Sequence, residues 1–231
     1  MRIAVSGSQK VGKTLFINEF LSSFQMYGTP ERTYRDTIAE NNLNINTEGD
    51  EDGQRAIRDA LVDQMTDASD KKYIVHDRCP LDNLAYTLYL ANAGRVSDDF
   101  VRESLIITSQ SVKMLDVIFY CPIKSGFSNI VGADGNPAPA NENPNRSDDE
   151  TFRESIDNIF MAFAEDNAHR KGWVFDPADA PPMIELAGNV AERIANVKNY
   201  IDDAGDSITT GINLEEEVTR IKESLPEPSR R

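Results

Sequence analysis

The fold is decided by residues 7–14, which read Gly7-Ser8-Gln9-Lys10-Val11-Gly12-Lys13-Thr14. This octapeptide fits the pattern G-x-x-x-x-G-K-[ST], a glycine-rich loop that binds phosphate. A short apolar run at residues 3–5 precedes it, and apolar residues at helical spacing follow it from Leu15 to Leu21. Because a strand, a glycine-rich turn and a helix are the context this loop requires, the sequence predicts a P-loop near the start of an α/β domain.

The residue types of this loop predict a division of labour. Glycines let the backbone wrap around a phosphate, so that the N–H groups of residues 8–14 point toward it. The helix that begins near Lys13 adds the positive end of its dipole. We expect Lys13 to reach the β- and γ-phosphates of a nucleotide and the Thr14 hydroxyl to bind Mg²⁺. A chance glycine turn is the alternative, and the agreement of motif and context disfavours it.

The composition is that of an acidic globular chain. The 231 residues carry a net charge of −15, and 39% of them are hydrophobic, which is enough for a sizeable core. Acidic surfaces repel the nucleic-acid backbone, so extensive duplex binding is disfavoured. We interpret the acidic runs at 48–52 and 215–217 as solvated surface.

Cysteine usage and hydropathy bear on the location of the protein. Two cysteines, Cys79 and Cys121, do not make a disulfide framework and favour a reduced, cytoplasmic protein, or the host cytoplasm for a viral one. A strand follows Met1 directly, so we expect no secretory signal, and no apolar run approaches the length of a membrane span. With two histidines and no cysteine pair at ligand spacing, a zinc site is not expected.

Strand and helix patterns alternate along the chain. Besides residues 3–5, we expect strands at 72–76, 117–121 and 183–186, and a short one near 26–29. The helical patterns cover 51–67, 81–91, 98–115, 150–168 and 188–201, the fourth starting at an S-x-x-E capping box from Ser147 to Glu150. This alternation predicts a parallel sheet covered by helices on both faces.

Two segments fall outside the alternation. Residues 124–149 are rich in Gly, Pro, Asn and Asp without periodicity, and in a phosphotransferase a lid would lie here. A tolerated surface insertion is an equal alternative. Residues 213–225 have one apolar helical face, which we expect to pack on the domain itself rather than on a partner.

A second chemical signal is Asp77-Arg78, which closes the strand at 72–76. Ligands of open parallel sheets bind at the carboxyl ends of the strands, so Asp77 should face the same crevice as the P-loop. A carboxylate there can bind Mg²⁺ or accept a proton from an attacking hydroxyl, and Arg78 can bind a phosphate or stabilise the transferred phosphoryl group. A structural Asp–Arg pair closing the strand is the alternative.

The segment Asp77-Arg78-Cys79-Pro80-Leu81-Asp82-Asn83-Leu84-Ala85-Tyr86, together with the P-loop, resembles the P-loop nucleoside and nucleotide kinases. It is most similar to the branch of AAA-type small ATPases that includes ribosylnicotinamide kinase domains, over residues 1–200. The resemblance implies a three-layer P-loop NTPase fold with five parallel strands, in a kinase domain at 1–204 with a lid-like loop, followed by a C-terminal helical extension at 205–231. The resemblance is also compatible with a family member encoded by a phage and with assembly into a homodimer.

The resemblance also implies roles for particular residues. Asp77 becomes the candidate base or metal contact, and Asp82 either shapes the acceptor pocket or, as we favour, caps its helix. Members of the family carry arginines on a lid that closes over the phosphates. The nearest candidates here are Arg146 and Arg153, of which we favour Arg146. The acceptor-site candidates are Glu31, Arg32 and Arg35, for which a solvated loop is the alternative. We interpret Tyr86 as a core residue rather than one that stacks on a base.

These observations lead to one hypothesis and two alternatives. The hypothesis is Mg²⁺-dependent transfer of a phosphoryl group from ATP to a nucleoside, nucleotide or related small acceptor. ATP is preferred over GTP because the sequence lacks the Asn/Thr-Lys-x-Asp signature of guanine recognition. The first alternative is a kinase of a hydroxymethylated pyrimidine in DNA, which the acidic balance disfavours. The second is a nucleotide-regulated NTPase or binding module with a protein partner.

Overall fold

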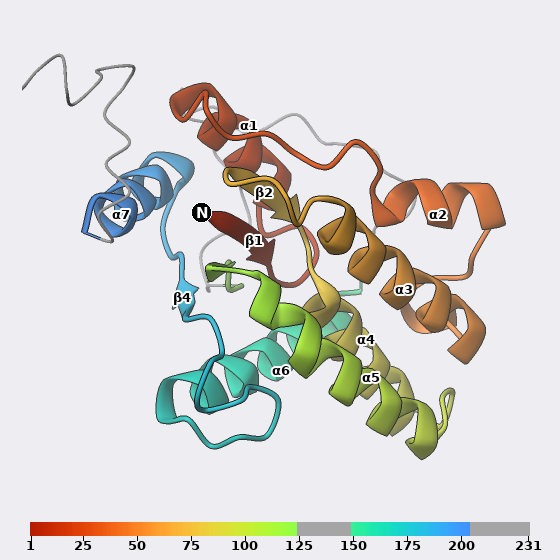
Figure 1. Cartoon of the computed structure of the whole chain (residues 1–231). Coiled ribbons are helices and arrows are strands. Elements are labelled where there is room, and N and C mark those ends of the chain that lie inside the picture. Colours follow the sequence, from red (N-terminus) through yellow and green to blue (C-terminus); the bar gives the residue numbers. More distant parts are fainter. Residues whose placement is uncertain (124–148, 204–231) are drawn as a thin grey trace, which may run out of the picture.

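The computed structural model describes residues 1–123 and 149–203. Their elements follow one another as strands and helices in an α/β order (Figure 1). In chain order these are β1 (Arg2–Ser6), α1 (Lys13–Ser23), α2 (Tyr34–Asn41), the 3-10 turn η1 (Asn46–Glu48), α3 (Glu51–Asp67), β2 (Ile74–Asp77), α4 (Pro80–Asn92), α5 (Asp98–Ser111), the 3-10 turn η2 (Val112–Met114), β3 (Val117–Tyr120), α6 (Glu150–His169), β4 (Met183–Glu185) and α7 (Val190–Asp203).

The sheet of the described residues has four parallel strands in the order β2-β1-β3-β4. In its register Val5 lies opposite both Asp77 and Phe119, so β1 is the central strand between β2 and β3. The P-loop follows β1 and Arg78 follows β2. Because parallel strands end at the same edge, this order brings the P-loop and the Asp77-Arg78 corner side by side.

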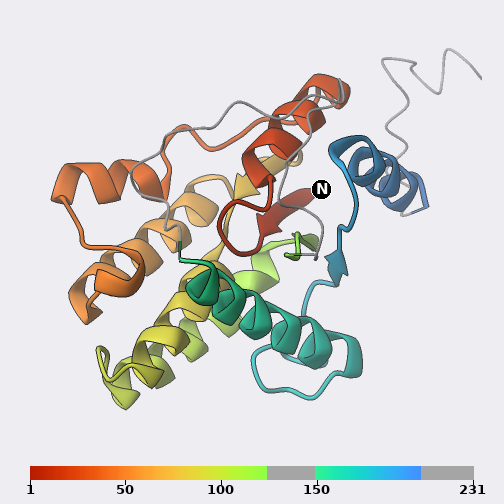
Figure 2. The same cartoon turned by 180° about the vertical axis from the view of Figure 1, so that it is seen from behind.

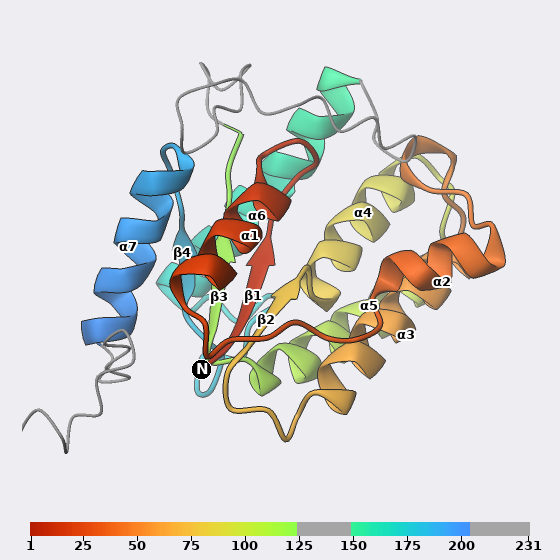
Figure 3. The same ribbon diagram turned by 90° about the horizontal axis from the view of Figure 1, so that it is seen from above.

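One face of the sheet is covered by α1 and α7 (Figure 3). Side chains alternate along a strand, so β1 presents Ile3 and Val5 to this face and Ala4 to the other. Phe16 and Phe20 of α1 pack here with Val197 of α7, all of them buried. This apolar layer holds the helix that begins at the P-loop firmly against the sheet.

The opposite face is covered by α4 and α6, and the view from behind brings α6 to the front (Figure 2). Here Leu84 of α4 and Phe160 of α6 pack against Ile118 and Tyr120 of β3. The ring of Tyr120 stacks on that of Phe160 with centroids 5.6 Å apart. The core therefore has three layers, as a doubly covered parallel sheet requires.

The predicted α/β fold is confirmed, with one strand fewer than the five expected. The predicted strand at 26–29 is reduced to an isolated bridge between Gly28 and Ile74. Glycine weakens a strand interior and Pro30 has no N–H to donate, so the pairing does not extend. All the helices predicted within the described residues are present, with ends shifted by a few residues.

Helix α2 is an element that the sequence analysis did not predict. It lies in a segment we read as a mixed-charge loop, and it begins with a capping box between Thr33 and Asp36. The Asp36 carboxylate accepts a hydrogen bond from the Thr33 backbone N–H at 2.7 Å. This T-x-x-D pattern is a helix start signal of the usual kind, with Asp in place of Glu.

Several expectations concern residues outside the described ranges. These are the lid-like loop at 124–149, of which only residue 149 is described, the lid candidate Arg146, the capping residue Ser147 and the C-terminal extension at 205–231. Helix α6 begins at Glu150, and its N-cap is Asp149, whose carboxylate accepts from the Phe152 N–H at 3.1 Å. Glu150 is therefore the first helical residue and not the third, so the predicted capping box from Ser147 to Glu150 is wrong. Within residues 1–123 and 149–203, no helix has the length and apolar character that crossing a membrane demands.

Candidate active site

The P-loop connects β1 to α1 through three residues with left-handed or related backbone conformations. These are Gly7 (φ +136°), Lys10 (φ +58°) and Gly12 (φ +82°). At Gly7 a Cβ atom would lie 2.4 Å from the backbone oxygen of Cys121, so a side chain has no room there. The two motif glycines therefore allow a turn that other residues would strain, as the sequence predicted.

Lys13 lies folded against this loop. Its Nζ donates hydrogen bonds to the backbone oxygens of Gly7 at 2.8 Å and Ser8 at 2.5 Å, and the side chain is buried. Burial and, after it, the positive charge of Arg78 lower the pKa of Lys13 to about 7. A negative charge placed beside the ammonium would reverse this shift, so the site is electrostatically suited to an anion.

Thr14 follows Lys13 in the first turn of α1 and lines the main pocket. Its hydroxyl is a ligand type that Mg²⁺ accepts when nucleotide phosphates and water complete the coordination. Within the described residues no three carboxylate, histidine or cysteine side chains converge into a metal cluster. The Thr14 hydroxyl is chemically suited to a magnesium ion that binds together with a nucleotide.

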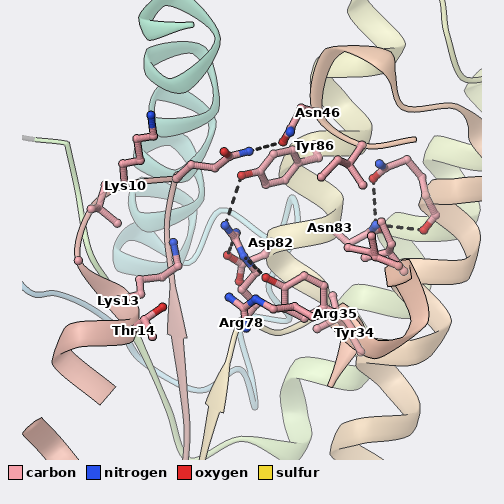
Figure 4. A pocket seen from close by; sticks show the side chains of 18 of the residues that line it. Lys10, Lys13, Thr14, Tyr34, Arg35, Asn46, Arg78, Asp82, Asn83 and Tyr86 are labelled. Atoms are coloured by element: carbon pink, nitrogen blue, oxygen red, sulfur yellow. Dashed lines mark hydrogen bonds and ion pairs between the residues drawn. The ribbon is translucent and has the colours of Figure 1, made fainter. Parts of the chain in front are cut away.

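Arg78 connects the P-loop to the far side of the pocket. It is buried, and its backbone takes the positive φ of +79° that is unusual outside glycine. Its guanidinium donates to Gly7 O at 3.2 Å. It also donates to Asp82 Oδ1 at 2.7 Å and to the hydroxyls of Tyr34 at 3.0 Å and Tyr86 at 3.4 Å (Figure 4). Four hydrogen bonds from one guanidinium restrain the geometry of the groups that it contacts.

Asp82 completes this connection. The carboxylate is 1% exposed and accepts hydrogen bonds from Arg78, from Gly7 N at 3.2 Å and from Cys79 N at 3.1 Å. The bond to Cys79 N caps α4, which is the role we favoured for this residue. The bond to Gly7 N ties the first residue of the P-loop to the corner after β2, a link that the sequence analysis did not foresee.

Asp77 ends β2 beside the P-loop. Its Oδ2 forms an ion pair with Arg35 at 2.8 Å. Its Oδ1 is buried and has no hydrogen-bond partner within residues 1–123 and 149–203. A buried acceptor without a donor is costly in a folded chain and is commonly explained by a ligand or an ion that supplies the missing contact.

A cavity of about 180 Å³ opens between the P-loop and the helices α2, α3 and α4. Lys13 and Thr14 border one side of it, Arg78 and Asp82 lie near its centre, and Asn83 lies on the side away from the P-loop (Figure 4). Four apolar side chains of the α2–α3 region also line it, namely Ile38, Ile45, Ile57 and Leu61.

The cavity also contains carboxamides. Asn83 Nδ2 donates to both the backbone oxygen and Oε1 of Gln54, at 3.0 and 2.9 Å, and both side chains are buried. Gln9 of the P-loop donates to Asn46 Oδ1, which bridges the P-loop to η1. The P-loop motif leaves its four middle positions open, so its pattern could not single out Gln9 for this contact.

A smaller pocket lies on the other side of the P-loop. Its lining includes Arg153 of α6 and Arg193 of α7, both bonded to the loop backbone. Arg153 Nε donates to Gln9 O at 3.1 Å, and Arg193 donates to Val11 O at 2.7 Å. Arg153, which we ranked below Arg146, therefore contacts the P-loop directly.

The sequence-predicted acceptor residues separate into two groups. Arg35 and Asp82 line the main cavity, whereas Glu31 and Arg32 are exposed and outside its lining. Arg32 forms an ion pair with Glu40 of α2 on the surface. Tyr86, interpreted as a core residue, packs against the core and also lines the cavity.

Sequence reasoning missed several cavity residues, among them Tyr34, Asn46, Gln54 and Asn83. Cys79, next to Arg78, is not suited to be a nucleophile, because burial, followed by the charge of Asp82, raises the pKa of its thiol to about 12. Both cysteines are buried free thiols.

No protein-family model matches the sequence, and no curated protein matches it either. Solved structures are similar in fold. Deoxyadenosine kinase from M. mycoides with bound dATP superposes with a TM-score of 0.61 at 15% identity, over 87% of this chain and 99% of that one. Thymidylate kinase from Candida albicans gives 0.53 at 11% identity, over 88% of this chain and 92% of that one.

NadR in complex with NR gives a TM-score of 0.60 at 12% identity, over 92% of this chain and 51% of NadR, so the chain spans about half the length of that protein. The chain has the fold of the P-loop nucleoside and nucleotide kinases. The resemblance drawn from Gly7–Thr14 and Asp77–Tyr86 is therefore confirmed at the level of the fold.

Proposed function

We propose that this protein is a kinase that transfers the γ-phosphoryl group of ATP, with Mg²⁺, to a small nucleoside-like acceptor. One observation carries the proposal: the P-loop and Arg78 line one cavity, and Asp77 comes directly before Arg78 at the end of the strand next to the P-loop strand. A phosphate loop beside a carboxylate and a pocket is the arrangement that in-line phosphoryl transfer requires.

The donor would bind along the P-loop. Backbone N–H groups of residues 8–14 would bind its β-phosphate, and the buried Lys13 ammonium would neutralise charge on the β- and γ-phosphates. Arg153 and Arg193, which donate to the P-loop backbone on the side away from the main cavity, would lie beside the bound donor. Thr14, with Asp77 through water, would hold Mg²⁺, which when bound withdraws charge from the phosphates during transfer.

The acceptor would occupy the main cavity, with its reacting oxygen toward the P-loop. That oxygen forms a bond to the γ-phosphorus while the bond from phosphorus to the β–γ bridging oxygen breaks, and ADP leaves. For a hydroxyl acceptor, the proton passes to the Asp77 carboxylate, whose Oδ1 lacks another donor within the described residues. Arg78 would stabilise the transferred group or hold Tyr34 and Tyr86 in place around the acceptor.

The test is incubation of the protein with γ-labelled ATP and Mg²⁺ against two acceptor pools, followed by chromatography. One pool contains nucleosides, nucleoside monophosphates and ribosylnicotinamide, and the other contains unmodified and hydroxymethyl-containing DNA. We expect label on a small acceptor. Label on DNA alone would favour the kinase of a hydroxymethylated pyrimidine, and free phosphate alone would favour a regulatory NTPase.

The variant Lys13→Ala should lose transfer while remaining folded, because Lys13 contributes charge rather than apolar packing. Lys71→Ala is the matched control, since Lys71 is exposed and lies at the opposite end of the sheet. Normal turnover by Lys13→Ala would contradict the proposed function.

A further inference from the structure

The chain that follows β3 leaves the sheet beside the P-loop. Cys121 N still donates to Ser6 O at the end of β1, at 2.9 Å. The next residue is Pro122, which has no N–H to donate. The backbone donor that comes after Cys121 is therefore the N–H of Ile123, and its partner determines where this part of the chain lies.

That partner is a buried carboxylate of α6. Asp157 Oδ2 accepts from Ile123 N at 3.0 Å, and Asp157 Oδ1 accepts from the Tyr120 hydroxyl at 2.8 Å. The residue is 5% exposed, and burial raises the pKa of its carboxyl group. Because a buried carboxylate is costly without hydrogen bonds, these two bonds hold the end of β3 and the chain after it against α6.

The same face of α6 also contacts the P-loop. Arg153 lies one helical turn before Asp157, and its Nε donates to Gln9 O at 3.1 Å. In return, the Ser8 hydroxyl donates to the backbone oxygen of Arg153 at 2.8 Å. Figure 3 shows the start of α6 beside the loop that joins β1 to α1. Helix α6 is therefore bonded to the P-loop through Arg153 and to the end of β3 through Asp157.

The residues held in this way line the smaller pocket. Pro122, Ile123 and Arg153 lie there together with residues 10–12 of the P-loop. In the strand order β2-β1-β3-β4 the chain passes from β1 to β2 on one side and then to β3 on the other. The crevice between β1 and β3 is thus the point where the strand order reverses, at which open α/β sheets bind their ligands.

We infer that Asp157 is a positioning residue for the donor side of the site. Its bonds to Tyr120 and Ile123 hold the chain after β3, and through α6 they hold Arg153, in the places that nucleotide binding at the P-loop requires. Asp157 acts through these groups and does not itself touch the nucleotide. The inference rests on the proposed function and concerns the affinity for the donor, not the identity of the acceptor. Such support from behind a site is what keeps its contacting groups in a productive geometry.

The experiment measures calorimetrically the binding of a non-hydrolysable ATP analogue with Mg²⁺. Asp157→Ala leaves Ile123 N without its acceptor and should raise the dissociation constant about 10-fold. Asp157→Asn should stay within about 3-fold of the parent protein, because its oxygen can accept from Ile123 N while its NH₂ group donates to the Tyr120 hydroxyl. In initial-rate kinetics KM for ATP should rise in Asp157→Ala, with KM unchanged for the acceptor that the parent labels best.

The matched control is Asp166→Ala, which removes a second buried carboxylate of the same helix. Asp166 is 2% exposed and accepts from the backbone N–H groups of residues 173–175, at the end of α6 away from the P-loop. This variant should lower the urea midpoint, as Asp157→Ala does, but leave the dissociation constant of the analogue unchanged. Equal weakening of binding in both variants would overturn the inference, because the effect would then be one of stability alone.

Tyr120→Phe decides the question if Asp157→Ala does not fold. It keeps the ring that stacks on Phe160 and removes one of the two donors to Asp157, so the dissociation constant should rise about 3-fold. An unchanged dissociation constant in Tyr120→Phe or in Asp157→Ala would overturn the inference. A parent protein that binds the analogue but labels no acceptor would overturn the proposed kinase and not the role of Asp157.

Discussion

Replacing Asp82 by alanine tests the connection that joins the two halves of the site. The substitution removes the partner of Arg78 at 2.7 Å and leaves the buried guanidinium without a carboxylate. It also removes the acceptor for Gly7 N and the cap of α4 at Cys79 N. Removing one partner of a buried ion pair costs about 3–5 kcal/mol, so we expect a loss of that size in the free energy of unfolding.

The assay is urea unfolding monitored by circular dichroism. Asp82→Ala should lower the urea midpoint without changing the m-value. Asp82→Asn keeps an acceptor oxygen, so its free energy of unfolding should fall by less. Asp70→Ala is the control, because Asp70 is exposed and its ion pair with Lys71 lies on the surface, and this variant should stay within about 0.5 kcal/mol of the parent protein. A loss below about 1 kcal/mol in Asp82→Ala would refute the claim that this ion pair organises the site.

Three further predictions concern individual side chains. Burial lowers the folded-state pKa of Lys13 to about 7 from 10.5, so the unfolded chain binds this proton more strongly, and the nucleotide-free protein should gain stability as pH rises from about 7 toward 10. Lys13→Met should lack this gain in urea midpoints measured at pH 7, 8 and 9, and parallel profiles would contradict the prediction. Tyr34→Phe removes the hydroxyl bonded to Arg78 and should raise the acceptor KM about 5-fold but not that of ATP, and initial-rate kinetics that show the reverse would place Tyr34 on the donor side. Arg153→Ala removes the bond to Gln9 O and should weaken binding of an ATP analogue about 5-fold or more in calorimetry, whereas an effect confined to the acceptor would contradict its place beside the donor.

The parts of the fold that the sequence predicted are those governed by local rules. The P-loop is encoded by contiguous residues with fixed conformational needs, of which Gly7 is the clearest case, since its φ and the nearby Cys121 oxygen exclude a side chain. The strands β1 and β3 were predicted because apolar residues cover both of their faces. Helix α2 was missed because its sequence is mostly polar and only the Thr33–Asp36 capping box marks its start.

The acceptor side of the site could be predicted only in part. The position of Asp77 and Arg78 beside the P-loop could be predicted because they end a strand, and the carboxyl ends of parallel strands lie at the same edge of an open sheet. Gln54 and Asn83 come from different helices, and no spacing in the sequence connects a buried carboxamide on α3 to one on α4. The ion pair of Arg35 with Asp77 likewise depends on how α2 packs in three dimensions.

The most direct test of the central claim is transfer of label from γ-labelled ATP to a nucleoside by the parent protein, Lys13→Ala and Asp77→Asn, measured side by side. If the P-loop and Asp77 form one phosphoryl-transfer site, the parent labels the nucleoside hydroxyl and Lys13→Ala does not. Loss of a general base typically lowers the rate about 10²- to 10⁴-fold, so Asp77→Asn should fall by that factor while still binding ATP. Parent-like labelling by Asp77→Asn would contradict its role as the base, and parent-like labelling by both variants would contradict the assignment of the site.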